Sequence, residues 1–110
     1  MPHSDATSTV SQLKTLVEQF VSERNWHQFH NAKNLSMALT IEAAELMEHF
    51  QWLTTQQVVA EEGYDRQQVT EELADITSYA LALANALHID LASAVAHKMV
   101  KNRLKYPVSE

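Results

Sequence analysis

Apolar residues recur at helical spacing along most of the chain, and each run of them predicts one helix. The first run predicts a helix over about residues 9–24 and comprises Val10, Leu13, Leu16, Val17, Phe20 and Val21. The second predicts a helix over about residues 34–50 and comprises Leu35, Leu39, Leu46 and Phe50. Two more helices are expected at about 66–87 and 91–105, because the pattern resumes there and Pro107 stops it. The stretch 25–34 is expected to be an ordered connection.

Residues that favour helix starts stand before these runs. They are Thr9, Thr54, Asp65 and Asp90, and the first two are followed three residues later by glutamine, as in a capping box. Thr54 begins a short helical turn that Gly63 is expected to end. The sequence therefore predicts an all-α fold of four main helices plus a short one, which should form a bundle because each long helix has an apolar face.

Composition narrows the class of protein. A chain of 110 residues is expected to form one domain, here a helical domain over 9–107 with tails at 1–8 and 108–110. One glycine, two prolines and no cysteine disfavour β-sandwiches, barrels and glycine-rich phosphate loops, and exclude thiol catalysis and zinc–thiolate sites. The net charge of -6 disfavours nucleic acid duplexes as partners. Without a long apolar run or a signal-peptide core, a cytoplasmic protein with no membrane partner is expected.

Two acidic side chains fall on the apolar side of the second predicted helix. At 100° per residue, Glu42 lies about 20° from Leu35, inside the apolar stripe, and Glu45 lies at its edge. Glu48 points away from this face, as a solvated glutamate would, whereas His49 shares the inner face. The helix therefore carries a Glu-x-x-Glu pair where apolar residues are expected.

The fourth helix repeats the pattern. With Leu73 as the reference direction, its apolar arc comprises Val69, Ala80, Ala84 and Leu87, which lie within about 40°, and Ile76, Tyr79 and Leu83 widen it. Glu72 lies inside this arc and Asp75 borders it, while Glu71 lies on the opposite face. Glu-x-x-Glu spacing is also common on solvated helices, but two inward pairs favour a site.

A divalent cation is the simplest way to stabilise four inward carboxylates. An unpaired buried carboxylate costs several kcal/mol, and neighbouring carboxylates repel one another. No Lys or Arg lies near these acids within the second or fourth helix. Donor sets made of oxygen alone suit Mg²⁺, or Mn²⁺ as a substitute, rather than zinc. Glu42, Glu45, Glu72 and Asp75 are therefore the candidate metal ligands.

Phosphate chemistry fits such a site better than di-iron chemistry. Di-iron bundles need Glu-x-x-His on two helices, and here only His49, four residues after Glu45, could serve. Carboxylate-held cations more often act on phosphates. Lys98 and Asn102, one turn apart on the last helix, could contact phosphate oxygens, although basic residues near a helix end also complement the helix dipole.

Aromatic residues cluster at the predicted helix ends. Trp26 and His30 precede the second helix, Trp52 follows it, and Tyr79 lies one turn past Asp75. The rings of Trp26, His30 and Trp52 could either pack in the core or stack on a nucleotide base, and the sequence leaves both open.

The ordered motifs resemble the all-α nucleoside triphosphate pyrophosphohydrolases, and within them the small single-domain MazG-like branch that includes dCTP pyrophosphatase. The resemblance covers about residues 9–107. Its motifs are Glu-x-x-Glu at 42–45, Glu-x-x-Asp at 72–75 within Glu-Glu-Leu-Ala-Asp at 71–75, Glu-Arg-Asn-Trp-x-x-Phe-His-x-x-x-Asn-Leu at 23–35, Phe-Gln-Trp at 50–52, and Lys-Met-x-x-Asn-Arg-x-x-Tyr-Pro at 98–107.

This resemblance implies Mg²⁺-dependent cleavage of a nucleoside triphosphate into a monophosphate and pyrophosphate, a house-cleaning reaction of the nucleotide pool. A deoxycytidine nucleotide is the first candidate substrate. The four acids would bind the metal, and Glu45 is the candidate proton acceptor. The resemblance assigns phosphate, sugar and base contacts to Trp26, His30, Asn34, Trp52, Tyr79, Lys98 and Asn102.

The resemblance also bears on the oligomeric state and on the base preference. The resemblance implies a homodimer or homotetramer with pockets at the interfaces, which agrees with the alanine-rich inward faces. The linker from Leu53 to Asp65 matches nothing in the family and could border the pocket. The alternative function is a non-catalytic helical dimerisation or nucleotide-sensing module, which would bind nucleotide or metal without hydrolysis.

Overall fold

The computed structural model describes residues 2–109, which form five α-helices and one 3₁₀ turn and contain no strand. The helices are α1 (Val10–Glu23), α2 (Ala32–Glu48), α3 (Thr55–Val59), α4 (Arg66–Leu87) and α5 (Leu91–Lys105), with the 3₁₀ turn η1 (His27–Phe29) between α1 and α2. The predicted all-α class, with four main helices and a short one, is therefore confirmed.

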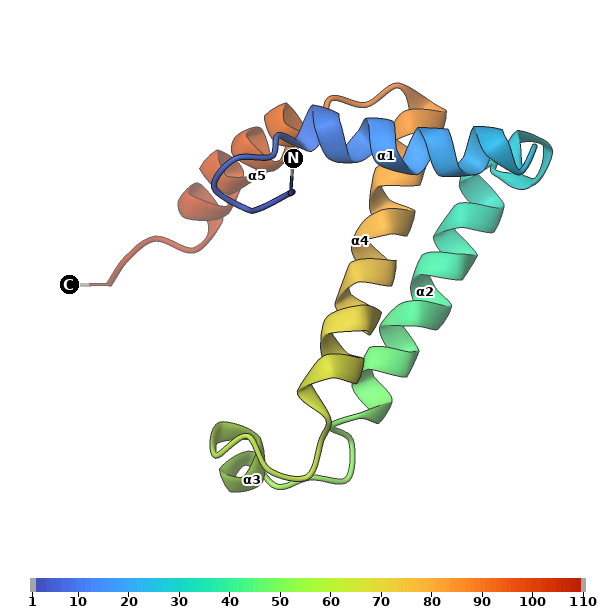
Figure 1. The fold of residues 1–110 in the computed structure, drawn as a ribbon. Helices are drawn as coiled ribbons and strands as arrows, with labels where there is room; N and C mark the ends of the chain where they lie inside the picture. Colours follow the sequence, from blue (N-terminus) through green and yellow to red (C-terminus); the bar gives the residue numbers. More distant parts are fainter. Residues whose placement is uncertain (1, 110) are drawn as a thin grey trace.

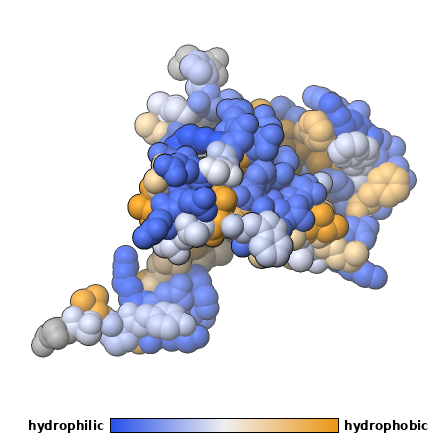
Figure 2. All heavy atoms as spheres, turned by 90° about the horizontal axis from the view of Figure 1, so that it is seen from below, coloured by the Kyte–Doolittle hydropathy of each residue, from blue (hydrophilic) through white to orange (hydrophobic). Residues whose placement is uncertain are grey.

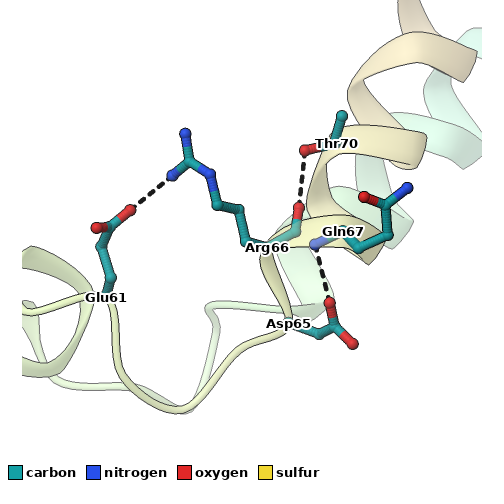
Figure 3. Close-up of polar contacts among 5 residues, drawn as sticks. All are labelled: Glu61, Asp65, Arg66, Gln67 and Thr70. Carbon is teal, nitrogen blue, oxygen red and sulfur yellow. Dashed lines mark hydrogen bonds and ion pairs between the residues drawn. The ribbon is translucent and has the colours of Figure 1, made fainter.

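The predicted caps define the helix starts. Thr9 and Thr54 each form a complete capping box with the glutamine three residues later. Asp65 accepts hydrogen bonds from the backbone N–H groups of Gln67 and Gln68, and Asp90 accepts one from Ser93. Figure 3 shows the start of α4, where Arg66 also reaches back to Glu61 with 2.6 Å between guanidinium nitrogen and carboxylate oxygen. Local capping fixes these starts independently of tertiary packing.

The second helix starts and ends two residues earlier than predicted. Asn31 is its N-cap, because its side-chain oxygen accepts from the backbone N–H of Asn34 at 2.9 Å. Asn34 is therefore inside the first turn and not at the start. The preceding connection is ordered, as expected, and it contains η1.

Helix ends use the left-handed conformation almost without glycine. Asn25 after α1, Glu61 after α3 and His88 after α4 all have positive φ angles between 54° and 56°. The prediction that Gly63 ends the short helix is wrong, because α3 stops at Val59 and Glu61 takes the left-handed position. Gly63, at φ 83°, instead shapes the linker further on.

The fold is built on an antiparallel pair of long helices. Figure 1 shows α2 and α4 side by side along their lengths, with α1 lying across their upper end. The fully buried side chains lie near this crossing and are Val21, Leu35, Leu81, Ala82 and Ala84. One hydrogen bond also ties α1 to α4, from the Asn85 amide to the Lys14 carbonyl at 3.0 Å. The core of the chain is thus small and sits at one end of the α2–α4 pair.

The predicted apolar arc of α4 is buried only in part. Leu73 is 55% exposed and Leu87 is 50% exposed, whereas Ala84 is buried and Ile76 and Glu72 are partly buried. The apolar arc of α4 is wide, and helical periodicity cannot say which part of a wide arc meets a neighbour. Packing against α2 places the buried side nearer Glu72.

The chain leaves much of its apolar surface open. Its radius of gyration is 16.8 Å, against roughly 13 Å for a compact chain of this length. It exposes 8804 Å² of surface, compared with about 6,200 Å² expected for a folded monomer of its mass. Figure 2 shows apolar side chains (orange) at the surface and the α5 arm projecting from the rest.

Within residues 2–109, no single helix has the length and apolarity needed to cross a membrane. Taken together, α4 and α5 have the required length and apolarity, but their axes are bent by 104° relative to each other.

Candidate metal centre

Three carboxylates face one another between α2 and α4. Glu42 and Glu45 lie one turn apart on α2, and Glu72 comes from the neighbouring part of α4. One oxygen atom from each of the three lies within 4.8 Å of the other two, and all three side chains are partly buried. The inward placement expected from the helical wheel thus produces a compact acidic cluster, which we call the Glu42–Glu45–Glu72 cluster.

The electrostatics of the cluster show that it is crowded with negative charge. Burial is the largest cause that raises the pKa of Glu42 to about 7. Hydrogen bonding with the Glu72 and Glu45 carboxyl groups, which needs a proton, acts in the same direction, as do the charges of Glu45 and Asp75. The cluster therefore favours a positive charge, from a proton or from a cation.

Two oxygen atoms of the cluster have no partner in the described chain. Oε2 of Glu42 and Oε2 of Glu72 are both buried, and unless the two carboxyl groups share a proton neither atom has a hydrogen-bond partner. Buried polar atoms are normally satisfied, so two such oxygens on facing helices indicate a missing partner. No Lys or Arg among residues 2–109 forms an ion pair with them. Their chemistry fits a hard divalent cation, which these residues could hold.

The remaining acids of the motifs lie outside the cluster. Asp75, one turn after Glu72, is exposed, although its charge contributes to the raised pKa of Glu42. Glu48 and Glu71 are also exposed, as predicted from their opposite faces. The structure thus brings three of the four predicted ligands together and leaves Asp75 at the rim.

Trp26 and His30 form one aromatic group beside the start of α2. Their ring centroids are 6.2 Å apart, and the edge of Trp26 meets Phe20 at 5.5 Å. Arg24 covers the other face of Phe20, with its guanidinium carbon 3.7 Å from the ring centroid. His30 also lines a pocket of about 470 Å³ between α1 and α4. Trp26 is 40% exposed, so part of its ring remains free for a ligand.

Asn34 supports this aromatic group from the first turn of α2. Its amide nitrogen donates to the carbonyl of Phe29 at 3.0 Å, which holds η1 against the helix. The side-chain oxygen of Asn34 remains free in the described chain. Tyr79, on α4 one turn past Asp75, is partly buried.

Trp52 lies at the opposite end of α2 from Trp26 and is 86% exposed. Because α2 has 17 residues, the two rings are separated by about 25 Å or more along the helix axis. One chain therefore does not bring these two predicted base contacts to one place.

The phosphate contacts predicted on α5 are also apart from the cluster. Lys98 is exposed and Asn102 is partly buried. Figure 1 shows α5 directed away from the α2–α4 pair, and 104° separates its axis from that of α4. In a single chain, the acidic cluster and the cationic helix do not meet.

The structure adds one residue that the sequence left undecided. The Nε2 atom of His49 lies 3.9 Å from Oε1 of Glu72. In the sequence, the only indication of this contact is that His49 lies on the inner face of the second predicted helix. A histidine that simply packs in the core would lie there too.

Comparisons with known proteins find similar sequences and a similar structure over most of the chain. The model of the MazG-like family matches residues 37–110. The chain is 41% identical over 102 residues to dCTP pyrophosphatase 1 of Rattus norvegicus, a match that covers 91% of this chain and 60% of the rat protein. The human protein of the same name is 40% identical, with 90% and 59% covered. The chain thus spans about three fifths of the length of these curated relatives.

A solved structure resembles nearly the whole fold. The crystal structure of a pyrophosphatase from Archaeoglobus fulgidus matches with a TM-score of 0.82 and 35% sequence identity, and the match covers 98% of this chain and 99% of that one. The extended arrangement of α1, α2, α4 and α5 therefore also occurs in an experimental structure.

Proposed function

The chain belongs to the MazG-like family, and on this premise we propose that it is a Mg²⁺-dependent nucleoside triphosphate pyrophosphohydrolase. The observation that carries the proposal is the Glu42–Glu45–Glu72 cluster, with two buried oxygens that lack a partner. The proposed reaction is attack of water on the α-phosphorus, cleavage of the bond to the bridging oxygen, and release of monophosphate and pyrophosphate.

The substrate class is proposed from relatives. Two mammalian relatives are named dCTP pyrophosphatase 1, and the archaeal structure is that of a pyrophosphatase. A deoxycytidine-like triphosphate is therefore our first candidate, with clearance of the cytoplasmic nucleotide pool as the proposed role.

The acidic residues have different proposed tasks. A bound Mg²⁺ supplies charge neutralisation of phosphate oxygens and a lowered pKa for bound water. Glu42 and Glu72, each with a buried Oε2 atom that lacks a partner, would hold it, with Asp75 completing the set from the rim. Glu45 has no such buried unpartnered oxygen, so it is our candidate to accept the proton of the attacking water.

The organic part of the substrate is assigned to the aromatic residues. Trp26 offers a partly exposed face for a base, and Asn34 and His30 stand beside it. Tyr79, which follows Asp75 by one turn of α4, is our candidate to pack against a deoxyribose. Lys98 and Asn102 supply the cationic and amide donors for the phosphates.

The separation of these groups supports a homo-oligomer, either a dimer or a tetramer. Trp26 and Trp52 lie at opposite ends of α2, and α5, which carries Lys98, is directed away from the α2–α4 pair. The chain also exposes about 2,600 Å² more surface than a folded monomer of its mass, an area in the range of obligate interfaces. We propose that a second copy completes each site.

A matched pair of variants tests the reaction. Glu72→Gln should lower kcat by at least about 100-fold, whereas Glu71→Gln, its exposed neighbour, should leave kcat unchanged. The wild type and each variant are incubated with Mg²⁺ and a panel of NTPs and dNTPs, and the products are identified. Monophosphate plus pyrophosphate is expected. Diphosphate plus phosphate would contradict the reaction, and binding without any product would favour the non-catalytic module.

A mixing experiment tests whether sites are shared. Glu72→Gln and Lys98→Ala are each expected to be inactive alone. The two variants are mixed in equal amounts, unfolded together and refolded. About half of the dimers should then contain one copy of each variant, and one of the two sites in such a dimer is intact. About a quarter of the wild-type activity should therefore return. No recovery would place Lys98 and Glu72 of one chain in the same site.

A further inference from the structure

Among the histidines of residues 2–109, only His49 has a ring nitrogen within 4.0 Å of a carboxylate of the acidic cluster, and this nitrogen lies outside the set of three carboxylate oxygens that are within 4.8 Å of one another. His49 forms the C-terminal cap of α2, where its side chain is 20% exposed and the side chain of Glu72 is 21% exposed. The other three ion pairs of the described chain join side chains that are each at least 42% exposed. The contact between His49 and Glu72 is therefore the only one of the four that lies in a sheltered position.

Helix geometry brings His49 to the same side as the two acids of α2. It follows Glu45 by four residues and Glu42 by seven, so the three side chains occupy successive turns of one face. The ring also meets the edge of Phe50, with centroids 6.5 Å apart, and Phe50 in turn meets Tyr64 at 5.0 Å. This aromatic packing limits the directions in which the imidazole can turn.

The spacing between His49 and Glu72 suits two ligands of one ion. Their nearest nitrogen and oxygen atoms are 3.9 Å apart, too far for a hydrogen bond. Two ligand atoms that each lie about 2.1 Å from one cation are at most about 4.2 Å apart. An ion between Nε2 of His49 and Oε1 of Glu72 is therefore compatible with the observed separation.

We propose that His49 is a nitrogen ligand of the cation that Glu72 binds, and that it shifts the preference of this site from Mg²⁺ toward Mn²⁺. This inference rests on the proposed metal site. Mg²⁺ strongly prefers oxygen ligands and dehydrates reluctantly, whereas first-row transition metals accept nitrogen ligands more readily, and Mn²⁺ is the one among them that carboxylates also suit. A cluster of carboxylates alone would not favour Mn²⁺ in this way, so the imidazole adds a selectivity that the acidic motif does not contain.

Metal binding, measured without substrate, tests the proposal. Dissociation constants of the full chain for Mn²⁺ and for Mg²⁺ are measured by calorimetry at one fixed, mildly alkaline pH, because metal binding competes with protons for the ligands. His49→Leu should weaken Mn²⁺ binding by at least about tenfold while changing Mg²⁺ binding less than about twofold. His97→Leu, an exposed histidine on α5, is the matched control and should change neither.

Pulsed electron paramagnetic resonance of the Mn²⁺-loaded protein gives a direct readout. Modulation from a coordinated ¹⁴N nucleus should appear in the wild type and in His97→Leu and be absent from His49→Leu. His49→Gln, which keeps a polar side chain of similar size, is the second variant in case the leucine variant does not fold. It should lose the same signal.

Three results would overturn the proposal. The first is the absence of nitrogen modulation in Mn²⁺-loaded wild type. The second is an equal loss of Mn²⁺ and Mg²⁺ affinity in His49→Leu, which would mean that the imidazole only positions Glu72. The third is that neither ion binds the wild type, and only this result would also remove the metal site of the proposed function.

Discussion

The two halves of α4 differ in what they bury. The C-terminal half, crossed by α1, contains Leu81, Ala82 and Ala84, which are three of the five fully buried side chains. The N-terminal half, paired with α2, buries the carboxyl group of Glu72 and leaves Leu73 half exposed. The same helix thus stabilises the fold at one end and holds a charged cluster, at a cost in stability, at the other.

The difference shows where the free energy of folding comes from. Burial of apolar area at the α1 crossing favours folding, whereas confinement of three carboxylates opposes it until a cation is bound. Substitutions in the two halves should therefore change stability in opposite directions.

The largest effect is expected in the apolar half. Leu81→Ala should lower the free energy of unfolding by about 2–5 kcal/mol, because a buried leucine leaves a cavity. Leu73→Ala on the other half should cost less than about 1 kcal/mol. Urea denaturation of both variants measures this. Equal losses would show that the two halves do not differ in this way.

The stability of the acidic half should depend on pH, and removing its charge should stabilise the chain, whereas Leu81→Ala destabilises it. The pKa of Glu42 is about 7 in the folded chain and near 4.5 when unfolded, so the folded state holds an extra proton between these values. Metal-free wild type should therefore lose stability as pH rises from 4.5 to 7.

Glu42→Gln should remove this loss, raising the metal-free melting temperature at pH 7.5 by a few degrees while abolishing stabilisation by Mg²⁺. Thermal melts at several pH values, with and without the ion, measure both effects. The exposed Glu48→Gln is the control. As the pH rises from 4.5 to 7, the melting temperature of the metal-free wild type should fall relative to that of Glu42→Gln. If it did not fall, the crowding of negative charge in the cluster would be contradicted.

A smaller effect is expected at the turn that joins α3 to α4. Gly63 has φ 83°, and an added Cβ would lie 2.7 Å from Cδ2 of Leu53. Gly63→Ala should cost about 1–2 kcal/mol, from the strained backbone and the displaced leucine. Urea denaturation measures this cost. Because the turn is outside the acidic cluster, Mg²⁺ affinity should stay within about twofold of wild type, and a larger change would link the turn to the cluster.

The smallest effect concerns the single side-chain hydrogen bond between α1 and the apolar half. Asn85→Ala should cost about 1 kcal/mol, because the Lys14 carbonyl loses the amide donor. Gln67→Ala removes an exposed bond to Glu71 in the acidic half and should cost less than about 0.5 kcal/mol. Equal unfolding free energies for both variants would show that this contact adds nothing to the crossing.

The amino-acid sequence by itself determined the helices and the inward acids. The bounds of α4 and α5 agree with the prediction because their caps, Asp65 and Asp90, act within one turn. The separation of Glu72 from Glu71 also follows from helical periodicity alone, since 100° per residue puts them on different faces.

Only the tertiary structure decided how these faces meet. The predicted apolar arc of α4 is wide and compatible with several orientations, and the position of α2 selects one that leaves Leu73 half exposed. The same packing brings His49 to Glu72, and the path of the chain separates Trp26 from Trp52 and Lys98 from the cluster. Distances between helices depend on contacts far apart in sequence, which neither periodicity nor capping encodes.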